Sequence, residues 1–253
     1  MIEVSHITKV YGKKKNQFTA LHDVSLTVPE PMTVAILGKS GSGKSTLMHA
    51  ISGLDKPQEG QVVIDGQDIL AMKSRATDKF RAQKMGFIFQ SFFVEGGESC
   101  YDNVSLSLET ARLPRSQRKA RIEAALAAVE LSDKIKVRAR DLSGGQKQRL
   151  AIARAIVGEP AVLFADEPTG NLDSATSARI EDLLFQYQRD HQATLIIVTH
   201  DEELAARCQM IVRVKDGQIE QIEQIEQIES QDQPDSDPDP AATKTATKEG
   251  VAK

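Results

Sequence analysis

Three short segments of the chain are apolar at nearly every position, and they end at Leu37, Ala165 and Val198. Such uninterrupted apolar runs are typical of parallel strands, because helices cover a parallel sheet on both faces. Two further strand-like segments lie at 61–64 and 86–89, and helix-like segments separate the strands along the chain. This alternation predicts an α/β fold whose central sheet is covered by helices on both faces.

Between residues 91 and 141 the sequence changes character and becomes rich in Arg, Lys and Ala. Apolar residues recur there at helical spacing among the charged ones, so we expect a helical subdomain inserted into the α/β domain. Its basic residues include Arg115, Arg118, Lys119 and Arg121. They form either a surface for a partner or the solvated face of a helix.

The last part of the chain differs in composition, which predicts a boundary at residue 219. The tripeptide Gln-Ile-Glu occurs four times in succession up to Glu229, and a stretch rich in Pro, Asp, Thr and Lys follows. A period of three fits neither a strand nor an ideal helix, so the repeats form either a short frayed helix or a strand extension. We therefore assign 1–219 to the folded domain and 220–253 to an acidic, low-complexity, disordered tail.

Composition and charge exclude several classes of protein. The net charge is −4, but 220–253 holds nine acidic and three basic residues, so 1–219 carries −4 minus −6, or +2. A folded part so close to neutrality gives no support to a nucleic-acid partner. No apolar run approaches the roughly 18 residues of a membrane-spanning helix, and Met1 leads into strand-like alternation rather than a signal peptide. Cys100 and Cys208 have neither disulfide nor metal-site spacing, which favours free thiols in a cytoplasmic protein.

A glycine-rich segment follows the apolar run that ends at Leu37 and precedes a helix-like segment. It matches the phosphate-binding pattern G-x-x-x-x-G-K-[ST] in the context that the pattern requires, the alternative being a glycine turn without a ligand. Glycines let backbone N–H groups point at phosphate oxygens, Lys44 is expected to reach the β and γ phosphates, and Ser45 to bind Mg²⁺. The predicted nucleotide-binding residues here are Gly38, Ser40, Gly41, Ser42, Gly43, Lys44, Ser45 and Thr46.

Two adjacent carboxylates, Asp166 and Glu167, follow the apolar segment 161–165. Idle acids at neighbouring positions repel each other, so their adjacency favours a function. We expect Asp166 to hold Mg²⁺ through its water shell and Glu167 to act as general base for an attacking water. The alternative is an acid pair at the N-terminus of a helix, and the phosphate loop argues against it.

The segment 142–146 reads Leu-Ser-Gly-Gly-Gln and leads into a helix-like segment. A hydroxyl, free backbone N–H groups and a helix dipole converge at such a helix start and suit a γ-phosphate. The segment resembles the signature motif of the ATP-binding cassette (ABC) ATPases. In that family the motif caps the ATP of the opposing subunit, so the resemblance implies a homodimer with two interfacial ATPs. The residues implied to bind nucleotide here are Ser143, Gly144, Gly145 and Gln146.

Four more residues resemble family positions in the expected order. Tyr11 resembles the aromatic residue that stacks on adenine, with a buried or turn tyrosine as the alternative. Gln90 resembles the Q-loop glutamine that contacts Mg²⁺ or water, and Asp173 resembles the D-loop aspartate. His200 follows a core strand and resembles the switch histidine near the γ-phosphate. The implied catalytic residues are Lys44, Gln90, Glu167 and His200, and the implied metal ligands are Ser45, Gln90 and Asp166.

The resemblance covers residues 1–219 and implies an ABC-type P-loop ATPase. This fold has a mostly parallel core sheet, an N-terminal antiparallel β subdomain and the inserted helical subdomain. ATP and Mg²⁺ are the implied ligands, and an integral-membrane permease is the implied partner. Lys39 stands where many relatives have proline, and the loop that contains Gly96 and Gly97 departs further from the family pattern. In the family this loop meets the permease, so the departure concerns the permease and not the ATPase chemistry.

Three kinds of ABC protein are compatible with this resemblance. A soluble mechanical ATPase of the DNA-repair or ribosome-associated kind needs long insertions or a second cassette, yet only 53 positions separate Gln90 from Ser143. A catalytically inactive regulatory cassette does not fit a chain that keeps Lys44, Glu167 and His200 together. The motor of a membrane transporter is the interpretation that these observations favour.

Among transporter motors, the segments 53–57, 87–90, 165–173 and 198–201 resemble the macrolide-exporter and lipoprotein-releasing subfamily. The resemblance implies a motor at the cytoplasmic face of the plasma (inner) membrane, held there by a separate four-helix permease in two copies. The expected cargo is a hydrophobic or peptide-like compound of the drug, antimicrobial-peptide, haem or lipoprotein class. The motor of an amino-acid importer is the alternative.

Overall fold

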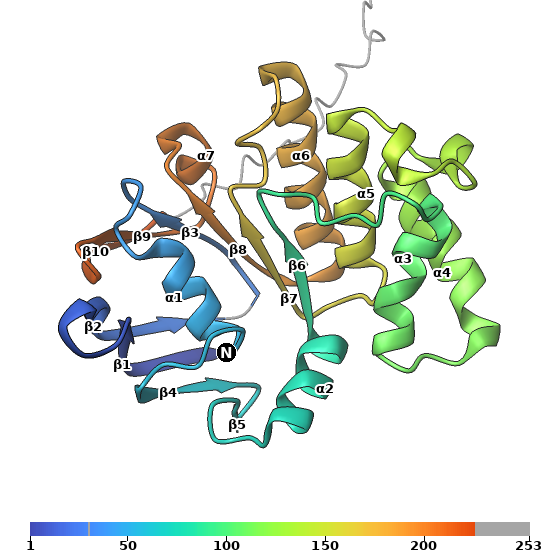
Figure 1. Cartoon of the computed structure of the whole chain (residues 1–253). Helices are drawn as coiled ribbons and strands as arrows, with labels where there is room; N and C mark the ends of the chain where they lie inside the picture. Colours follow the sequence, from blue (N-terminus) through green and yellow to red (C-terminus); the bar gives the residue numbers. More distant parts are fainter. Residues whose placement is uncertain (30, 226–253) are drawn as a thin grey trace, which may run out of the picture.

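Two β-sheets organise the chain in the computed structural model, which describes residues 1–29 and 31–225 (Figure 1). The larger sheet has six strands in the order β10-β9-β3-β8-β7-β6. All its pairings are parallel except that of β9 with β10. Its strands are β3 (Thr33–Leu37), β6 (Met85–Ile88), β7 (Val162–Asp166), β8 (Thr194–Thr199), β9 (Met210–Lys215) and β10 (Gln218–Gln224). The mostly parallel core sheet expected from the sequence is confirmed.

The second sheet is antiparallel and has the strand order β2-β1-β4-β5. Its strands are β1 (Ile2–Tyr11), β2 (Phe18–Val28), β4 (Glu59–Ile64) and β5 (Gln67–Asp68). Buried and exposed residues largely alternate along β1 and β2, which is the pattern of a sheet with one solvated face. This sheet is the N-terminal antiparallel subdomain that the family resemblance implies.

Alternate residues of the core strands pack into two separate hydrophobic clusters. In β3, Val34 and Ile36 belong to a cluster shared with the antiparallel sheet and helix α1 (Lys44–Ile51). Ala35 and Leu37 belong to a cluster shared with the other large helices. Successive side chains of a strand point to opposite faces of the sheet, so an uninterrupted apolar run supplies both clusters at once.

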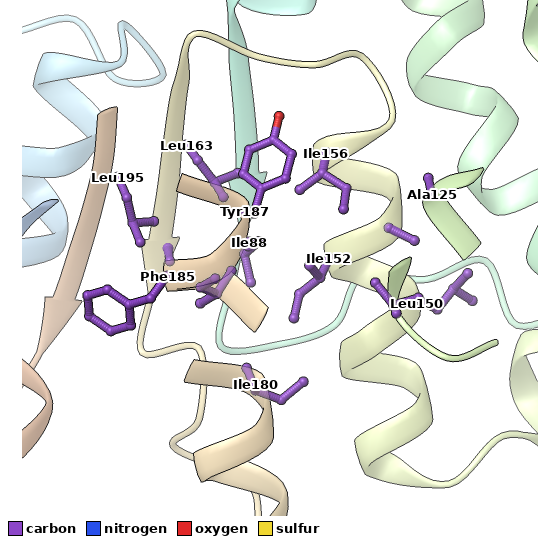
Figure 2. Close-up of a cluster of buried hydrophobic side chains, with 14 of the residues drawn as sticks. Ile88, Ala125, Leu150, Ile152, Ile156, Leu163, Ile180, Phe185, Tyr187 and Leu195 are labelled. Carbon is purple, nitrogen blue, oxygen red and sulfur yellow. The ribbon is translucent and has the colours of Figure 1, made fainter. Parts of the chain in front are cut away.

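The helices that contribute to the second cluster include α5 (Gly144–Ile156), α6 (Ser174–His191) and α7 (Glu202–Ala206). Figure 2 shows part of this cluster, in which Leu163 and Leu195 of the sheet lie among Ile152 of α5 and Tyr187 of α6. This face of the sheet therefore carries the helices that begin with the segments 142–146 and 167–173.

The segment predicted to be a helical subdomain contains α3 (Cys100–Thr110) and α4 (Arg115–Ala128), and both pack against α5. Two short 3-10 turns, Ser132–Lys134 and Ala139–Asp141, lead from α4 to α5. Helix α2 (Ser74–Lys84) lies before this segment and runs into β6. No helix in residues 1–29 and 31–225 combines the length and the apolar character that crossing a membrane requires.

The Gln-Ile-Glu repeats begin inside the fold rather than after it. Strand β10 runs to Gln224 along β9, and the N–H of Ile225 donates to the carbonyl of Gln209 at 2.8 Å. The boundary expected at residue 219 therefore falls within a strand, and the first two repeats adopt the strand alternative. Because a period of three is odd, Ile219 packs on the core while Ile222 is 45% exposed. The disorder expected further along the tail concerns residues 226–253, which lie outside the described residues.

Candidate active site

The loop between β3 and α1 leaves the first turn of α1 open to a ligand. Gly43 is the N-cap residue with a φ of 104°, and no side chain caps the helix. A Cβ at Gly43 would lie 2.8 Å from the carbonyl oxygen of Ala20, so a larger residue does not fit. Ser42 is buried, and within the described residues its Oγ has no hydrogen-bond partner. Uncapped N–H groups and an unpaired buried hydroxyl around one loop suit phosphate oxygens.

Lys44 supplies the positive charge of this loop. Lys44 is only 6% exposed, and its Nζ donates to the carbonyl of Lys39 at 2.9 Å. A buried ammonium group is costly unless an anion compensates it. Lys44 therefore fits the predicted contact with the β and γ phosphates.

Two of the three predicted metal ligands meet at the carboxyl end of β7. The Oγ of Ser45 donates to Oδ1 of Asp166 at 3.1 Å. Burial raises the pKa of Asp166, and this outweighs the opposing effects of the Ser45 hydrogen bond and of nearby His49. A hydroxyl beside a carboxylate is a ligand pair that Mg²⁺ accepts, and the ion would compensate the buried charge.

The third predicted metal ligand, Gln90, lies against the loop 167–173. Its carbonyl accepts a hydrogen bond from Nδ2 of Asn171 at 3.0 Å, and its Nε2 lies 3.5 Å from where a Cβ on Gly170 would stand. Within residues 1–29 and 31–225 its side chain forms no hydrogen bond with Ser45 or Asp166. Its role as a metal ligand therefore stays a prediction. The hydrogen bond with Asn171 connects it to the loop 167–173.

Glu167 and His200 face each other at the ends of neighbouring strands. Nδ1 of His200 lies 2.9 Å from both carboxylate oxygens of Glu167. The Glu167 backbone has a φ of 46°, in the left-handed region where a non-glycine residue is strained, and its N–H donates to the carbonyl of Val198 at 2.9 Å. The two predicted catalytic residues are thus brought together, and the strained backbone aims the carboxylate.

A buried glutamine that sequence reasoning missed holds the next residue of this loop. Nε2 of Gln148, on α5, donates to the carbonyl of Pro168 at 2.7 Å, and Gln148 is 1% exposed. At the far end of the loop, the carboxylate of Asp173 caps α6 by accepting from the N–H of Thr176 at 3.0 Å. The hydroxyl of Thr176 also donates to Oδ2 of Asp173 at 2.7 Å. The side-chain and backbone hydrogen bonds from Thr176 lower the pKa of Asp173. Both ends of the loop 167–173 are therefore anchored to helices.

The signature segment starts α5 with a complete capping box. Ser143 Oγ accepts from the N–H of Gln146 at 3.3 Å, and Gln146 Oε1 accepts from the N–H of Ser143 at 3.0 Å. A Cβ at Gly145 would lie 2.9 Å from Cγ2 of Thr176, whereas a Cβ at Gly144 would meet nothing within 4 Å. Gly145 therefore has a packing role at α6, and Gly144 leaves open space at the helix start.

The signature segment does not meet the phosphate loop of its own chain. Leu150 and Ile152 of α5 belong to one hydrophobic cluster, and Leu47 and Met48 of α1 belong to the other, on the opposite face of the core sheet. A helix start on one face cannot contact a nucleotide held at the other face without a second copy of the chain. The geometry agrees with the dimer that the sequence motif implies.

Tyr11 is held by a polar network that the sequence pattern did not indicate. Its hydroxyl donates to Oδ2 of Asp55 at 2.6 Å, and Nζ of Lys9, a residue only 5% exposed, pairs with the same carboxylate. Burial opposes the charge of Asp55, but the hydrogen bonds from Lys9 and Tyr11 lower its pKa overall. Phe18, opposite Tyr11 in the β1–β2 pairing, is 61% exposed with its ring 5.6 Å away. The half-buried ring of Tyr11 is therefore fixed next to the exposed ring of Phe18.

Comparison with known proteins identifies the family of this site. A family model described as ABC transporter matches residues 21–170. The chain belongs to the ABC transporter family. It is 41% identical over 221 residues to YbbA of Escherichia coli (strain K12), an uncharacterised ABC transporter ATP-binding protein, which covers 87% of this chain and 97% of that protein. It is also 42% identical over 219 residues to the lipoprotein-releasing system ATP-binding protein LolD of Syntrophotalea carbinolica, which covers 87% and 96% of the two chains.

Solved structures of this family show the same fold. The dimeric structure of MJ0796, a bacterial ABC transporter cassette, matches with a TM-score of 0.82 at 37% identity over 88% of this chain and 98% of that chain. A dimeric post-hydrolysis state of MJ0796 bound to ADP and Pi matches with the same TM-score at 36% identity. This chain is therefore an ABC ATPase that binds ATP with Mg²⁺, and both matched MJ0796 structures are dimers. ABC ATP-binding subunits work with a membrane permease.

The loop that departs from the family pattern is tied to the residues before the signature segment of this ABC ATPase. Asn103 is fully buried and bonds to the backbone of Glu95 in both directions. The carbonyl of Gly96 accepts from the N–H of Arg140 at 3.0 Å. Arg154 of α5 donates to the carbonyls of residues 92 and 93. The loop is therefore hydrogen-bonded to residues near both ends of α5.

An apolar groove of about 640 Å³ lies between α2, β6, α3 and the end of α5. Leu54, Phe87, Phe89 and Leu106 are among its lining residues. Beside it Phe93 is 66% exposed, and its ring meets that of Phe89 edge-on at 5.5 Å. An exposed aromatic residue at the border of an apolar groove is typical of a surface that binds a protein partner.

Proposed function

We propose that this ABC ATPase is the motor of an exporter that extrudes a hydrophobic or peptide-like compound through a separate permease. The observation that carries the proposal is the alignment of Ser45–Asp166 and Glu167–His200 at one edge of the core sheet. Similarity to the lipoprotein-releasing protein LolD supports export of a compound of the lipoprotein class. The chain then works at the cytoplasmic face of the membrane that holds the permease.

The residues divide the ATPase reaction among them. Lys44 and the N–H groups of the phosphate loop bind the β and γ phosphates, and Thr46 extends the same helix turn. Ser45 and Asp166 would hold Mg²⁺, with Gln90 as a further ligand. When bound, Mg²⁺ neutralises charge on the phosphate oxygens. Catalysis of this kind consists mainly of positioning and electrostatic stabilisation, so these contacts carry most of the rate.

Glu167 and His200 act on the attacking water. Glu167 accepts the proton of the water as the water attacks the γ-phosphate in line, and the bond from the γ-phosphorus to the bridging oxygen breaks so that ADP leaves. His200, 2.9 Å from both carboxylate oxygens, orients Glu167 and contributes a hydrogen bond near the γ-phosphate. The anchored loop that begins at Glu167 keeps this geometry while the rest of the dimer moves.

The second copy of the chain completes each site. Ser143, Gly144 and Gly145 offer a hydroxyl and free N–H groups to the γ-phosphate of the partner's ATP, and Tyr11 stacks on adenine. Gln146 keeps Ser143 in place through the capping box, and Asp173 keeps the start of α6 at the same interface. ATP thus joins the two copies, and hydrolysis removes the phosphate that both of them hold.

The permease occupies the apolar groove between α2 and α3. The loop 91–99 borders this groove and is bonded to the segment before the signature helix, so movement of the permease reaches the dimer interface. We propose a permease of four membrane helices in two copies, one for each motor subunit.

The test is recovery of the complex from membranes of the native host. Glu167→Gln removes the general base, so we expect loss of ATPase turnover, retained ATP binding and a stable dimer that co-purifies with its permease from detergent extracts. Glu203→Gln, a change of the same charge at an exposed position of α7, is the matched control and should behave as wild type. Mass spectrometry of the recovered partner identifies the permease.

Two outcomes would overturn the proposal. Unchanged steady-state ATPase activity in Glu167→Gln would remove Glu167 from catalysis. Recovery of a bare dimer, or of a dimer with nucleic acid or ribosomes, would remove the permease. Recovery of an importer permease together with a substrate-binding protein would reverse the direction of transport and leave the ATPase assignment intact.

A further inference from the structure

Exposed cations lie on and just before α2, the helix that forms one flank of the groove. Lys73, just before α2, and Arg75 and Lys79 on α2 are exposed, and none of them has an ion pair within the described residues. Asp78, the acidic residue of α2, is already paired with Arg81. Arg75 and Lys79 are four residues apart, so their charges repel each other on one helix face. This flank carries three positive charges that no ion pair neutralises within residues 1–29 and 31–225.

The turn between α3 and α4, on the other flank, has the same character. Arg112, Arg115 and Lys119 are exposed. In the described part of the chain only Lys119 has an ion pair, at 3.9 Å with Glu123. Arg115 is the first residue of α4, whose first turn has no acidic residue although a helix N-terminus favours negative charge. Within the described residues, Arg112 and Arg115 therefore have no ion pair, and Lys119 has one long one.

We call these residues the basic rim: Lys73, Arg75, Lys79, Arg112, Arg115 and Lys119. They lie on α2, on α4 and in the turns before these helices, and they are not among the residues that line the groove. Both α2 and the end of α3 line the groove, so the two flanks face each other across it. Figure 1 shows α2 and the α3–α4 turn at the lower edge of the molecule, whereas α5 and α6 begin at the upper edge. The rim is therefore remote from the phosphate-binding and catalytic residues, and ATP does not explain its charge.

We propose that the basic rim binds anionic phospholipid headgroups of the membrane that holds the permease. This inference rests on the proposed function, because it is the permease in the groove that brings the rim to the membrane. A cluster of four to eight Lys and Arg residues beside a membrane is attracted to an anionic leaflet. Cytoplasmic loops of membrane proteins are themselves enriched in Lys and Arg, so the permease surface is a poor electrostatic complement to the rim. Anionic lipid headgroups supply the negative charge that complements both the basic rim and the basic loops of the permease.

The test measures partition of the full chain onto vesicles by co-sedimentation. One set of vesicles is phosphatidylcholine alone, and the other contains equal parts of phosphatidylcholine and phosphatidylglycerol. Each cation near an anionic surface contributes roughly a fivefold increase in binding, so replacing Lys73, Arg75 and Lys79 by Gln lowers partition onto the anionic vesicles on the order of 100-fold. Binding also weakens steeply as salt rises, because the Debye length is only about 10 Å at 0.1 M salt.

The matched control replaces Lys13, Lys14 and Lys15 by Gln, which removes the same charge from the exposed turn between β1 and β2. We expect this control to keep wild-type partition, and a second triple variant at Arg112, Arg115 and Lys119 to lose it. ATPase activity of both rim variants in solution stays at the wild-type level, which shows that they are folded.

Three results would overturn the inference. The rim is not a lipid surface if the wild-type chain does not bind anionic vesicles or if the rim variants partition like wild type. Nor is it one if the Lys13–Lys15 control loses as much binding as the rim variants. Loss of binding to detergent-solubilised permease, with vesicle partition unchanged, would make the rim a protein contact instead. None of these results bears on ATP hydrolysis or on co-purification of the Glu167→Gln chain, so a failure of this inference is distinguishable from a failure of the proposed function.

Discussion

Gln148 offers a way to disturb the loop 167–173 without changing a residue that is proposed to contact ATP. Gln148→Met keeps the length and volume of the side chain but removes the N–H that donates to the carbonyl of Pro168 at 2.7 Å. Pro168 follows Glu167, so the substitution releases the loop at the point where the catalytic carboxylate is aimed. The expected effect is a change in turnover rather than in folding.

The magnitudes support this separation. A buried carbonyl left without a donor costs roughly 1–3 kcal/mol. The substitution also removes Gln148 Oε1, a buried acceptor that has no partner within the described residues, and this offsets part of the cost. Glu167, at a φ of 46°, stores strain of about 1–3 kcal/mol that the released loop can shed. We therefore expect the free energy of unfolding to fall by about 1 kcal/mol or less.

Turnover responds differently, because a catalytic group displaced by about 1 Å can cost on the order of 100-fold in rate. We expect kcat for ATP to fall about 10- to 100-fold in Gln148→Met, with KM and Tm close to wild type. Gln188→Met is the control, since Gln188 is a buried glutamine on α6 whose side chain makes no hydrogen bond to the loop within residues 1–29 and 31–225. A kcat within twofold of wild type, or a loss of kcat matched by a loss of Tm, would refute the reasoning.

Three further substitutions test other contacts of the site. Tyr11→Phe keeps the ring but loses the hydrogen bond to Asp55, so KM for ATP should rise by up to about fivefold at nearly constant kcat; an unchanged KM speaks against the network. Gly145→Ala places a Cβ 2.9 Å from Cγ2 of Thr176 and should lower the free energy of unfolding by about 1–3 kcal/mol, and Thr176→Ser in the same chain should restore it because serine lacks that methyl group; denaturant titration decides. Burial raises the pKa of Asp166 above 3.8, so the ionised form destabilises the Mg²⁺-free fold and stability falls as pH rises through the folded-state pKa. Asp166→Asn should therefore have the higher Tm above that range and the same Tm below it, and a constant offset at every pH contradicts this.

The parts of the protein that the sequence predicts are those whose evidence is contiguous. The apolar run 33–37 is strand β3, and its buried positions divide between two clusters because successive strand residues face opposite sides. The phosphate loop is equally local, since strand, glycines, lysine and hydroxyl lie within about 13 residues of one another. The period of three in the tail was ambiguous because neighbouring β9, rather than the repeat itself, makes the first two repeats a strand.

The polar contacts that support the site were not predictable from such patterns. Gln148 reaches Pro168 over 20 positions, and Lys9 reaches Asp55 over 46 positions, so only the packed fold brings the partners together. A lysine on a strand or a glutamine on a helix has no sequence signature that separates a buried anchor from a solvated side chain. Their roles become visible through burial and through the atoms that they satisfy.

The signature segment shows why a motif alone does not assign a role to each of its residues. The side chain of Gln146 forms the capping box with Ser143, and Thr176 leaves no room for a Cβ at Gly145. The fold of a single chain therefore explains both residues. Gly144 is not, because a Cβ there would meet nothing within 4 Å. A glycine that its own chain leaves unconfined is the position at which a second molecule can approach the backbone closely. We therefore expect a substitution at Gly144 to affect the proposed contact with the partner's nucleotide rather than the stability of the fold.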